Sequence, residues 1–277
     1  MLRLALAFCL PVACSRPPGA EPASSAPRLA SFSPALTELL FSMGLGDQVV
    51  GVTRYCELPE GETRPVLGDA ITVSAEGVLA VDPDVLLIQS DPARFAPIQQ
   101  LEPDLQIEHF TIETLAEISA AQRRLGVLAG QPERGEEAAR AFETGLEGVR
   151  TKSAGLQRPR LLFVTGSEKP GTAGGGTFVD ELIGLAGAEN AAANLHGWAT
   201  LDLEYALAAA PEVLVCWSPE ADADRDLARW RALRDLPAAR DGRVFGITAQ
   251  SWITPTPRLV GHAEELLAMV HPELAHP

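Results

Sequence analysis

One phrase occurs twice in this chain, and the repetition limits the possible folds more than any other feature. Residues 76–87, EGVLAVDPDVLL, align with residues 204–215, EYALAAAPEVLV, as Glu-x-x-Leu-Ala-x-x-Pro-acidic-Val-Leu. Two other landmarks recur in the same order: PRLASFSP at 27–34 with PRLLFVTG at 159–166, and ELLFSMGLGD at 38–47 with ELIGLAGAEN at 181–190. Such self-similarity indicates a duplicated unit, so we expect two halves that are built alike.

Each half has the pattern strand, helix, strand, short helix, strand. RLASF and RLLFV are apolar β-type runs, and in the first half Ser33 and Pro34 then suit the cap and first turn of a helix that ends near Gly44. The runs DVLLIQ and EVLVCW are continuously apolar, as is typical of parallel strands covered on both faces. The sequence therefore predicts two Rossmann-like α/β lobes with parallel sheets.

The segment between the halves is helical in its periodicity. From about Glu133 to Ala154, small or apolar residues recur at helical spacing, over more than twenty residues. We expect one long backbone helix to join the lobes and to hold them at a nearly constant angle. The expected boundaries are a N-terminal lobe at 28–131, a linking helix at 132–156, a C-terminal lobe at 157–272 and a tail at 273–277.

The first residues predict export. Residues 1–14, MLRLALAFCLPVAC, combine one basic residue with an apolar run that is too short to span a bilayer, as in a secretion signal. Its end resembles a bacterial lipoprotein signal, which predicts lipidation at Cys14, although Pro11 departs from that pattern. Residues 15–27 are rich in Pro, Ser, Gly and Ala and predict a flexible tether. The alternative is a cytoplasmic protein whose start codon is misassigned.

Charge limits the partners. Acidic residues outnumber basic residues 37 to 22, and the net charge is −15. Because this charge repels polyanions, we exclude nucleic acid and anionic lipid surfaces as partners, apart from a lipid anchor.

The duplicated lobes, the long helix and the lipoprotein-like signal together resemble the helical-backbone substrate-binding proteins of ABC importers, a family that includes periplasmic cobalamin binders. The motifs that carry the resemblance are SFSPALTELLFSMGLGDQVVGVTRYCELP, SAEGVLAVDPDVLL, LDLEYALAAAPEVLV and SWITPTPRLV, and it extends from about Arg28 to Val270. The resemblance implies a monomeric, extracytoplasmic binding protein that delivers a small molecule to permease subunits.

The resemblance gives the repeat a function. In that family each lobe presents a glutamate at the start of the short helix, and the pair docks onto arginines of the permease. Glu76 and Glu204 match those positions, and each is expected at the second residue of its helix, after Ser74 or Asp202 as cap. A carboxylate at an exposed helix N-terminus stays ionised and can pair with arginine.

Ligands of open α/β sheets bind at the carboxyl ends of the strands, so the residues that follow the strands are the candidates. Three aromatic residues, Tyr55, Trp217 and Trp252, fall at such ends and suit a large, flat, partly apolar ligand. The resemblance implies that Tyr55 and Trp252 contact cobalamin, and it adds Trp198. The remaining candidates at strand ends are Ser33, Pro34, Arg54, Cys56 and Ser218.

One difference from the cobalamin-binding pattern leaves other ligands as alternatives. Ala70 stands where the cobalamin binder has tryptophan. Relatives of this architecture bind ferric siderophores or haem, for which Arg54, Arg258 and Tyr55 could serve as anion partners or as an iron ligand.

Metal cargo and catalysis are not expected. The histidines show no i,i+4 pair, and Cys56 and Cys216 form no zinc-type cluster. The chain lacks the G-x-S-x-G, H-E-x-x-H, P-loop and G-x-G-x-x-G motifs. The glycine-rich stretch 170–178, PGTAGGGTF, has two interpretations, a close-approach loop that lines the cleft or an anion site. We therefore expect a binding protein that needs no cofactor, with an α/β enzyme as the lower-ranked alternative.

Overall fold

The computed structural model describes residues 26–69 and 72–275. The expected signal at 1–14 with Cys14, most of the tether at 15–27, Ala70, and the last two residues of the tail lie outside the described residues.

The N-terminal lobe is a doubly wound sheet. Its four strands lie in the order β2-β1-β3-β4 and are all parallel. The strands are β1 Leu29–Ser31, β2 Val49–Gly51, β3 Val85–Ile88 and β4 Gln106–His109. The helices are α1 Pro34–Ser42, α2 Ala75–Val81, α3 Ala96–Leu101 and α4 Leu115–Leu128.

Alternation along the strands explains the two layers of helices. On β1, Leu29 packs with α1 and α4, whereas its neighbour Ala30 packs with α2 and α3. On β3, Leu87 lies in the cluster with α1 and α4, and its neighbour Leu86 lies in the cluster with α2 and α3. Both faces of the sheet are therefore buried, which accounts for the continuous apolar runs.

The C-terminal lobe repeats this plan and adds an antiparallel edge. Its sheet has the order β10-β9-β5-β6-β8, with β7 also paired to β5. Strands β5, β7, β9 and β10 are parallel, whereas β6 and β8 are antiparallel to their neighbours. The strands are β5 Arg160–Thr165, β6 Gly171–Ala173, β7 Glu189–Asn190, β8 Trp198–Thr200, β9 Val213–Trp217 and β10 Val244–Ile247.

The helices of this lobe lie on two faces. α6 Phe178–Leu185 and α10 Leu259–Val270 pack on one face of the sheet, and α7 Leu203–Ala209, α8 Glu220–Ala232 and α9 Pro237–Arg240 on the other. Short 3-10 turns complete the described chain at η1 Gly46–Gln48, η2 Pro92–Phe95, η3 Gln250–Ile253 and η4 Pro272–Ala275. The prediction of two α/β lobes with parallel sheets is confirmed, and the antiparallel pair β6/β8 was not foreseen.

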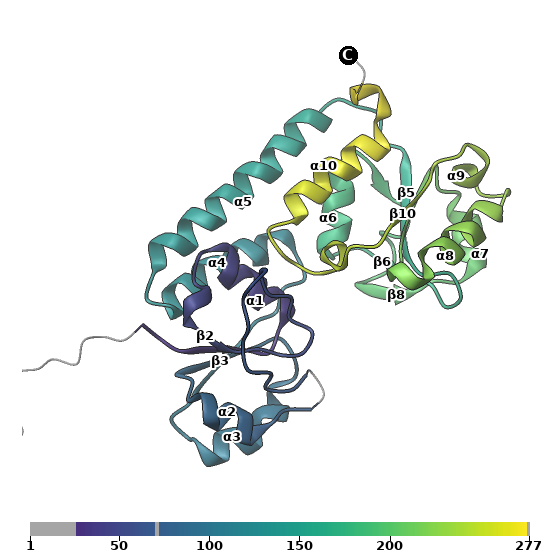
Figure 1. Cartoon of the computed structure of the whole chain (residues 1–277). Helices are drawn as coiled ribbons and strands as arrows, with labels where there is room; N and C mark the ends of the chain where they lie inside the picture. The colour runs from purple at the N-terminus through teal and green to yellow at the C-terminus, as the bar shows by residue number, and fades with distance from the viewer. Residues whose placement is uncertain (1–25, 70–71, 276–277) are drawn as a thin grey trace, which may run out of the picture.

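The linking helix is α5 Pro132–Ser153, which has 22 residues and is therefore roughly 33 Å long. It runs alongside α10 and meets α4 at its N-terminal end (Figure 1). Its buried side chains Phe142, Leu146 and Val149 belong to a core cluster that also contains residues of both sheets. One hydrophobic core thus runs through both lobes.

The repeat is reproduced in detail. Asp82 and Ala210 end the two short helices in the left-handed conformation, with φ of 43° and 44°. The acidic residue after each proline accepts a hydrogen bond from the backbone nitrogen of Arg28 or Arg160: Asp84 at 2.7 Å and Glu212 at 3.1 Å. In each half, the acidic residue after the proline therefore joins the start of one parallel strand to the start of the strand beside it in the sheet.

Most predicted helix ends are confirmed. Ser33 caps α1 by accepting a hydrogen bond from the Leu36 nitrogen, and Gly44 follows the helix with φ of 68°. Ser74 caps α2 through the Gly77 nitrogen. Asp202 occupies the cap position of α7, but its side chain makes no capping hydrogen bond.

The glycine-rich stretch permits a close backbone approach. A Cβ atom on Gly174 would lie 2.4 Å from the Leu195 carbonyl oxygen, and one on Gly175 would lie 2.5 Å from that of Ala193. The amides of Gly174, Gly175 and Gly176 donate to Gly197, Leu195 and Asp180. Because these donors are engaged within the chain, the anion-site interpretation is wrong.

Packing of α5 against α4 depends on two glycines. A Cβ on Gly135 would lie 2.5 Å from the Gln122 carbonyl oxygen and 3.1 Å from the Gly126 Cα. Gly135→Ala is therefore expected to lower the free energy of unfolding by about 1–3 kcal/mol through overpacking. Urea denaturation followed by circular dichroism measures this change.

Gly148→Ala is the matched control, since it lies on the same helix and a Cβ there would meet no atom within 4 Å. This substitution should raise the free energy of unfolding by about 0.5–1 kcal/mol, because alanine favours the helix. An equal loss of stability in both variants would contradict the role of close helix packing.

Candidate functional site

The carboxyl ends of the parallel strands define the candidate site. In the N-terminal lobe, Ser33 and Pro34 follow β1, and Arg54, Tyr55 and Cys56 follow β2. In the C-terminal lobe, Trp217 ends β9, Ser218 follows it, and Trp252 follows β10. Trp198 begins β8, and Arg258 is the residue before α10.

Neutral polar groups cluster at the strand ends of the N-terminal lobe. The Cys56 sulfur lies 3.2 Å from each of the Thr37 and Thr53 hydroxyl oxygens. The Ser33 hydroxyl donates a hydrogen bond to the side-chain oxygen of Gln89, which follows β3. Thr37 and Gln89 escaped the sequence analysis, because a residue in mid-helix and a residue after an apolar run carry no signal of their own.

Two aromatic side chains face solvent among the described residues, one in each lobe. Tyr55 is 62% exposed and Trp198 is 43% exposed. The Trp198 ring rests edge-on against Phe163 and Phe178, with centroid distances of 6.4 and 6.1 Å. Packing on one side thus orients the indole and leaves much of it available to a ligand.

Three other predicted ligand residues are less exposed than Tyr55 and Trp198. Trp252 is 3% exposed, and the Ser218 hydroxyl is buried and donates to Asp226 at 2.9 Å. Trp217 is half-buried, and its indole nitrogen donates to the Ala249 carbonyl at 3.0 Å. Position at a strand end did not determine the direction of these side chains, because the core of the C-terminal lobe extends to that edge.

Trp252 stacks on His262 of α10, with ring centroids 4.3 Å apart. The Ser251 hydroxyl lies 2.8 Å from the His262 Nε2 atom. Burial lowers the pKa of His262, against the opposing influence of Glu265. The imidazole is therefore kept neutral and belongs to the wall behind the strand ends.

A buried carboxylate lies behind the strand ends of the C-terminal lobe. Asp226 of α8 accepts hydrogen bonds from the hydroxyls of Ser167 and Ser218. Burial by itself would raise the pKa of Asp226, but these hydrogen bonds and the contact with Arg225 lower it below its usual value. The sequence analysis missed this residue, whose one signal was an acidic residue on the buried face of a helix.

Both candidate arginines are already paired with carboxylates. The Arg258 Nε atom donates to Glu38 of α1 at 2.8 Å, although 220 residues separate the two in the chain. The Arg54 Nε atom lies 3.4 Å from Asp69. The first pair joins the two lobes, since α1 belongs to one lobe and Arg258 to the other.

The two repeated glutamates are exposed at equivalent positions. Glu76 is the second residue of α2 and Glu204 is the second residue of α7. The placement of both at the second helical position is confirmed. In each lobe the glutamate side chain is accessible to a partner.

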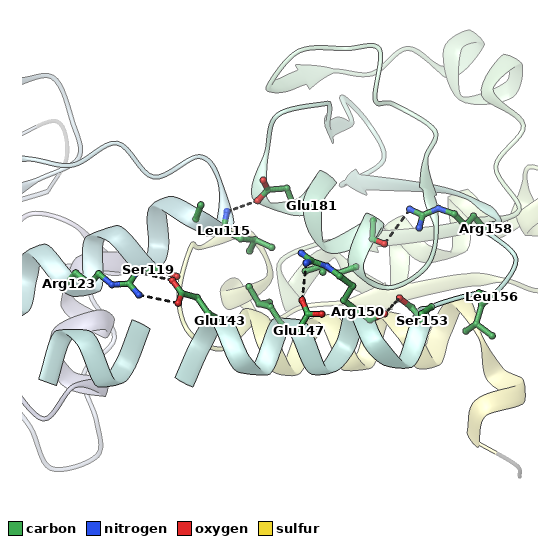
Figure 2. A pocket seen from close by; sticks show the side chains of 16 residues that line it. Leu115, Ser119, Arg123, Glu143, Glu147, Arg150, Ser153, Leu156, Arg158 and Glu181 are labelled. Carbon is green, nitrogen blue, oxygen red and sulfur yellow. Dashed lines mark hydrogen bonds and ion pairs between the residues drawn. The ribbon is translucent and has the colours of Figure 1, made fainter. Parts of the chain in front are cut away.

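A cavity in the described part of the chain lies away from the predicted ligand residues. It has a volume of about 950 Å³ and is lined by α4, α5, α6 and the segment 153–158. In Figure 2, the backbone nitrogen of Leu115 donates to Glu181 at 2.6 Å across the lobe junction, and Arg123 pairs with Glu143. None of the predicted ligand residues lines this cavity.

In 26–69 and 72–275, no helix is long and apolar enough to cross a bilayer. Over the same ranges, no three His, Cys, Asp or Glu side chains converge in a way that could hold a metal ion.

Comparison with known proteins agrees with this architecture. A family model described as periplasmic binding protein matches residues 29–251. The uncharacterized ABC transporter substrate-binding lipoprotein YvrC of Bacillus subtilis is 26% identical over 263 residues, covering 89% of this chain and 80% of YvrC.

Two solved structures share the fold and 25% of the sequence. The apo form of the periplasmic haem-binding protein RhuT from Roseiflexus sp. RS-1 matches with a TM-score of 0.77, covering 90% of this chain and 99% of RhuT. The periplasmic vitamin B12-binding protein BtuF of Vibrio cholerae matches with a TM-score of 0.76, covering 90% of this chain and 98% of BtuF. Because the family model spans most of the chain and both lobes, this chain belongs to the periplasmic binding protein family.

Proposed function

We propose that this protein is the extracytoplasmic substrate-binding component of an ABC importer, and that it captures cobalamin or a related corrinoid between its two lobes. The observation that carries the proposal is the exposure of one flat aromatic side chain in each lobe, Tyr55 and Trp198. A large planar ligand held between the lobes could bury both rings.

The names of similar proteins support this assignment. YvrC is named as a substrate-binding lipoprotein of an ABC transporter and BtuF as a vitamin B12-binding protein. These names favour transport over catalysis and favour an exported protein anchored through Cys14. The Cys56 thiol and the Gln89 amide, which are partly exposed at the strand ends of the N-terminal lobe, are suited to the amide side groups of a corrinoid.

A ferric siderophore or haem is the second candidate ligand. The similarity to RhuT, which is named as a haem-binding protein, favours haem as strongly as overall similarity to BtuF favours cobalamin. Tyr55 would then be the residue available as an iron ligand.

A fluorescence titration distinguishes the ligands. Cyanocobalamin is expected to quench the tryptophan emission of the purified protein with one-to-one stoichiometry, whereas haem and a ferric siderophore should bind more weakly. Trp198→Ala should weaken cobalamin binding roughly tenfold, by loss of the stacking surface. Leu203→Ala, which alters another exposed apolar side chain of the same lobe, should leave the affinity unchanged. Quenching by haem alone would replace cobalamin with the second candidate.

Docking through Glu76 and Glu204 is the second testable part of the proposal. Glu76→Gln and Glu204→Gln should each slow cobalamin uptake by proteoliposomes that contain the cognate permease, and the double variant should reduce uptake by about tenfold or more. Cobalamin affinity in solution should not change, because both residues lie on helices outside the strand ends.

Glu220→Gln is the control for docking. Glu220 is an exposed first-turn glutamate of α8 in the same lobe as Glu204, and it has no counterpart in the repeat. Uptake that falls equally in all three variants, or a loss of cobalamin affinity in the Glu76 and Glu204 variants, would refute the docking role.

A further inference from the structure

The charge state of the candidate site limits the chemistry of its ligand. Two arginines belong to the candidate site: Arg54 follows β2 and Arg258 precedes α10. Either could have held a carboxylate of an anionic chelate. Each is instead paired with a carboxylate of the protein itself, Asp69 at 3.4 Å and Glu38 at 2.8 Å. Lys169, which follows β5, lines a different cavity together with Glu168 and Asp202.

Glu38 cannot readily withdraw from Arg258. It lies on α1, where Leu36, Leu39 and Leu40 are fully buried and Ser33 caps the first turn. The Glu38 side chain is 22% exposed, whereas that of Arg258 is 60% exposed. An anionic group that reached for Arg258 would have to displace a carboxylate and then remain close to it, in a chain whose net charge is −15.

Several hydrogen-bonding groups at the strand ends belong to side chains that are not basic. In the N-terminal lobe they are the hydroxyls of Ser33, Thr37 and Thr53, the Cys56 thiol and the Gln89 amide. Ser33, Thr37 and Thr53 are buried and bonded within the lobe, and none of these groups supplies a cation that could hold a carboxylate.

We propose that Glu38 is a specificity-determining residue: by neutralising Arg258 across the lobe junction, it selects ligands whose periphery carries amides or hydroxyls and disfavours those that carry carboxylates. Within the proposed function, on which this inference rests, the site therefore selects a corrinoid over haem, because the corrinoid periphery is rich in amides and haem carries two propionates.

The test measures the affinities of the full exported protein for cyanocobalamin, haem and haem dimethyl ester, in the wild type and in three variants. Glu38→Gln removes the competing carboxylate and leaves the Arg258 cation available. It should tighten haem binding by about tenfold or more, since a charge-assisted hydrogen bond becomes available. The affinities for cyanocobalamin and for the dimethyl ester, which has no free carboxylate, should change little.

Arg258→Gln separates charge from mechanical coupling. It breaks the same contact between the lobes but supplies no cation, so haem binding should not improve. Glu38→Ala serves as a second charge-removing variant, and circular dichroism with urea denaturation verifies that each protein is folded.

Three results would overturn the inference while the proposed function stands: no gain in haem affinity in either Glu38 variant, an equal gain in Arg258→Gln, or an equal gain for the dimethyl ester. Wild-type protein that binds haem at least as tightly as cyanocobalamin would also overturn it. Wild-type protein that binds none of the three probes would instead remove the proposed function and the inference with it.

Discussion

The structure depends on one helix that has to cover two sheets. Each lobe buries its sheet between helices, but neither lobe closes its own core, because α5 contributes Phe142, Leu146 and Val149 to a single cluster that runs through both. α10 packs along the same helix from the C-terminal lobe. The lobes are thus held at their junction by shared apolar packing, and a helix absorbs little of the dihedral change that a loop hinge allows.

Polar contacts at the junction supplement this core. The Leu115 backbone nitrogen donates to Glu181, and Arg258 donates to Glu38, each joining an element of one lobe to an element of the other. A partly exposed ion pair adds little to stability, usually less than about 1 kcal/mol. The pair between Glu38 and Arg258 is therefore better explained by what it does to the local charge than by what it adds to the fold.

The duplication also explains which residues are constrained by structure and which are free for function. In both halves the residue after the proline bonds to the start of the first strand, and the residue before the proline-acidic turn adopts a left-handed conformation. Those positions serve the fold of each half. Glu76 and Glu204 are exposed first-turn residues that the fold does not require, since neither caps its helix or pairs with another element in any contact described. Their repetition is for that reason the stronger indication of a shared partner.

The sequence by itself determined the features that depend on neighbours along the chain. The α/β class, the long α5, the caps at Ser33 and Ser74 and the helix end at Gly44 follow from periodicity and from residues three or four positions apart, and all are seen in the structure. The equivalence of Glu76 and Glu204 could be predicted for the same reason. Only the tertiary structure decided which way the strand-end side chains point and which charges meet. Trp252 turns into the core to stack on His262, the hydroxyls of Thr37 and Thr53 meet Cys56, and Arg258 meets Glu38 across 220 residues of sequence. The contacts of Trp252 and of Thr37 depend on how each lobe folds, and the pair between Arg258 and Glu38 forms only when the shared core brings the two lobes together.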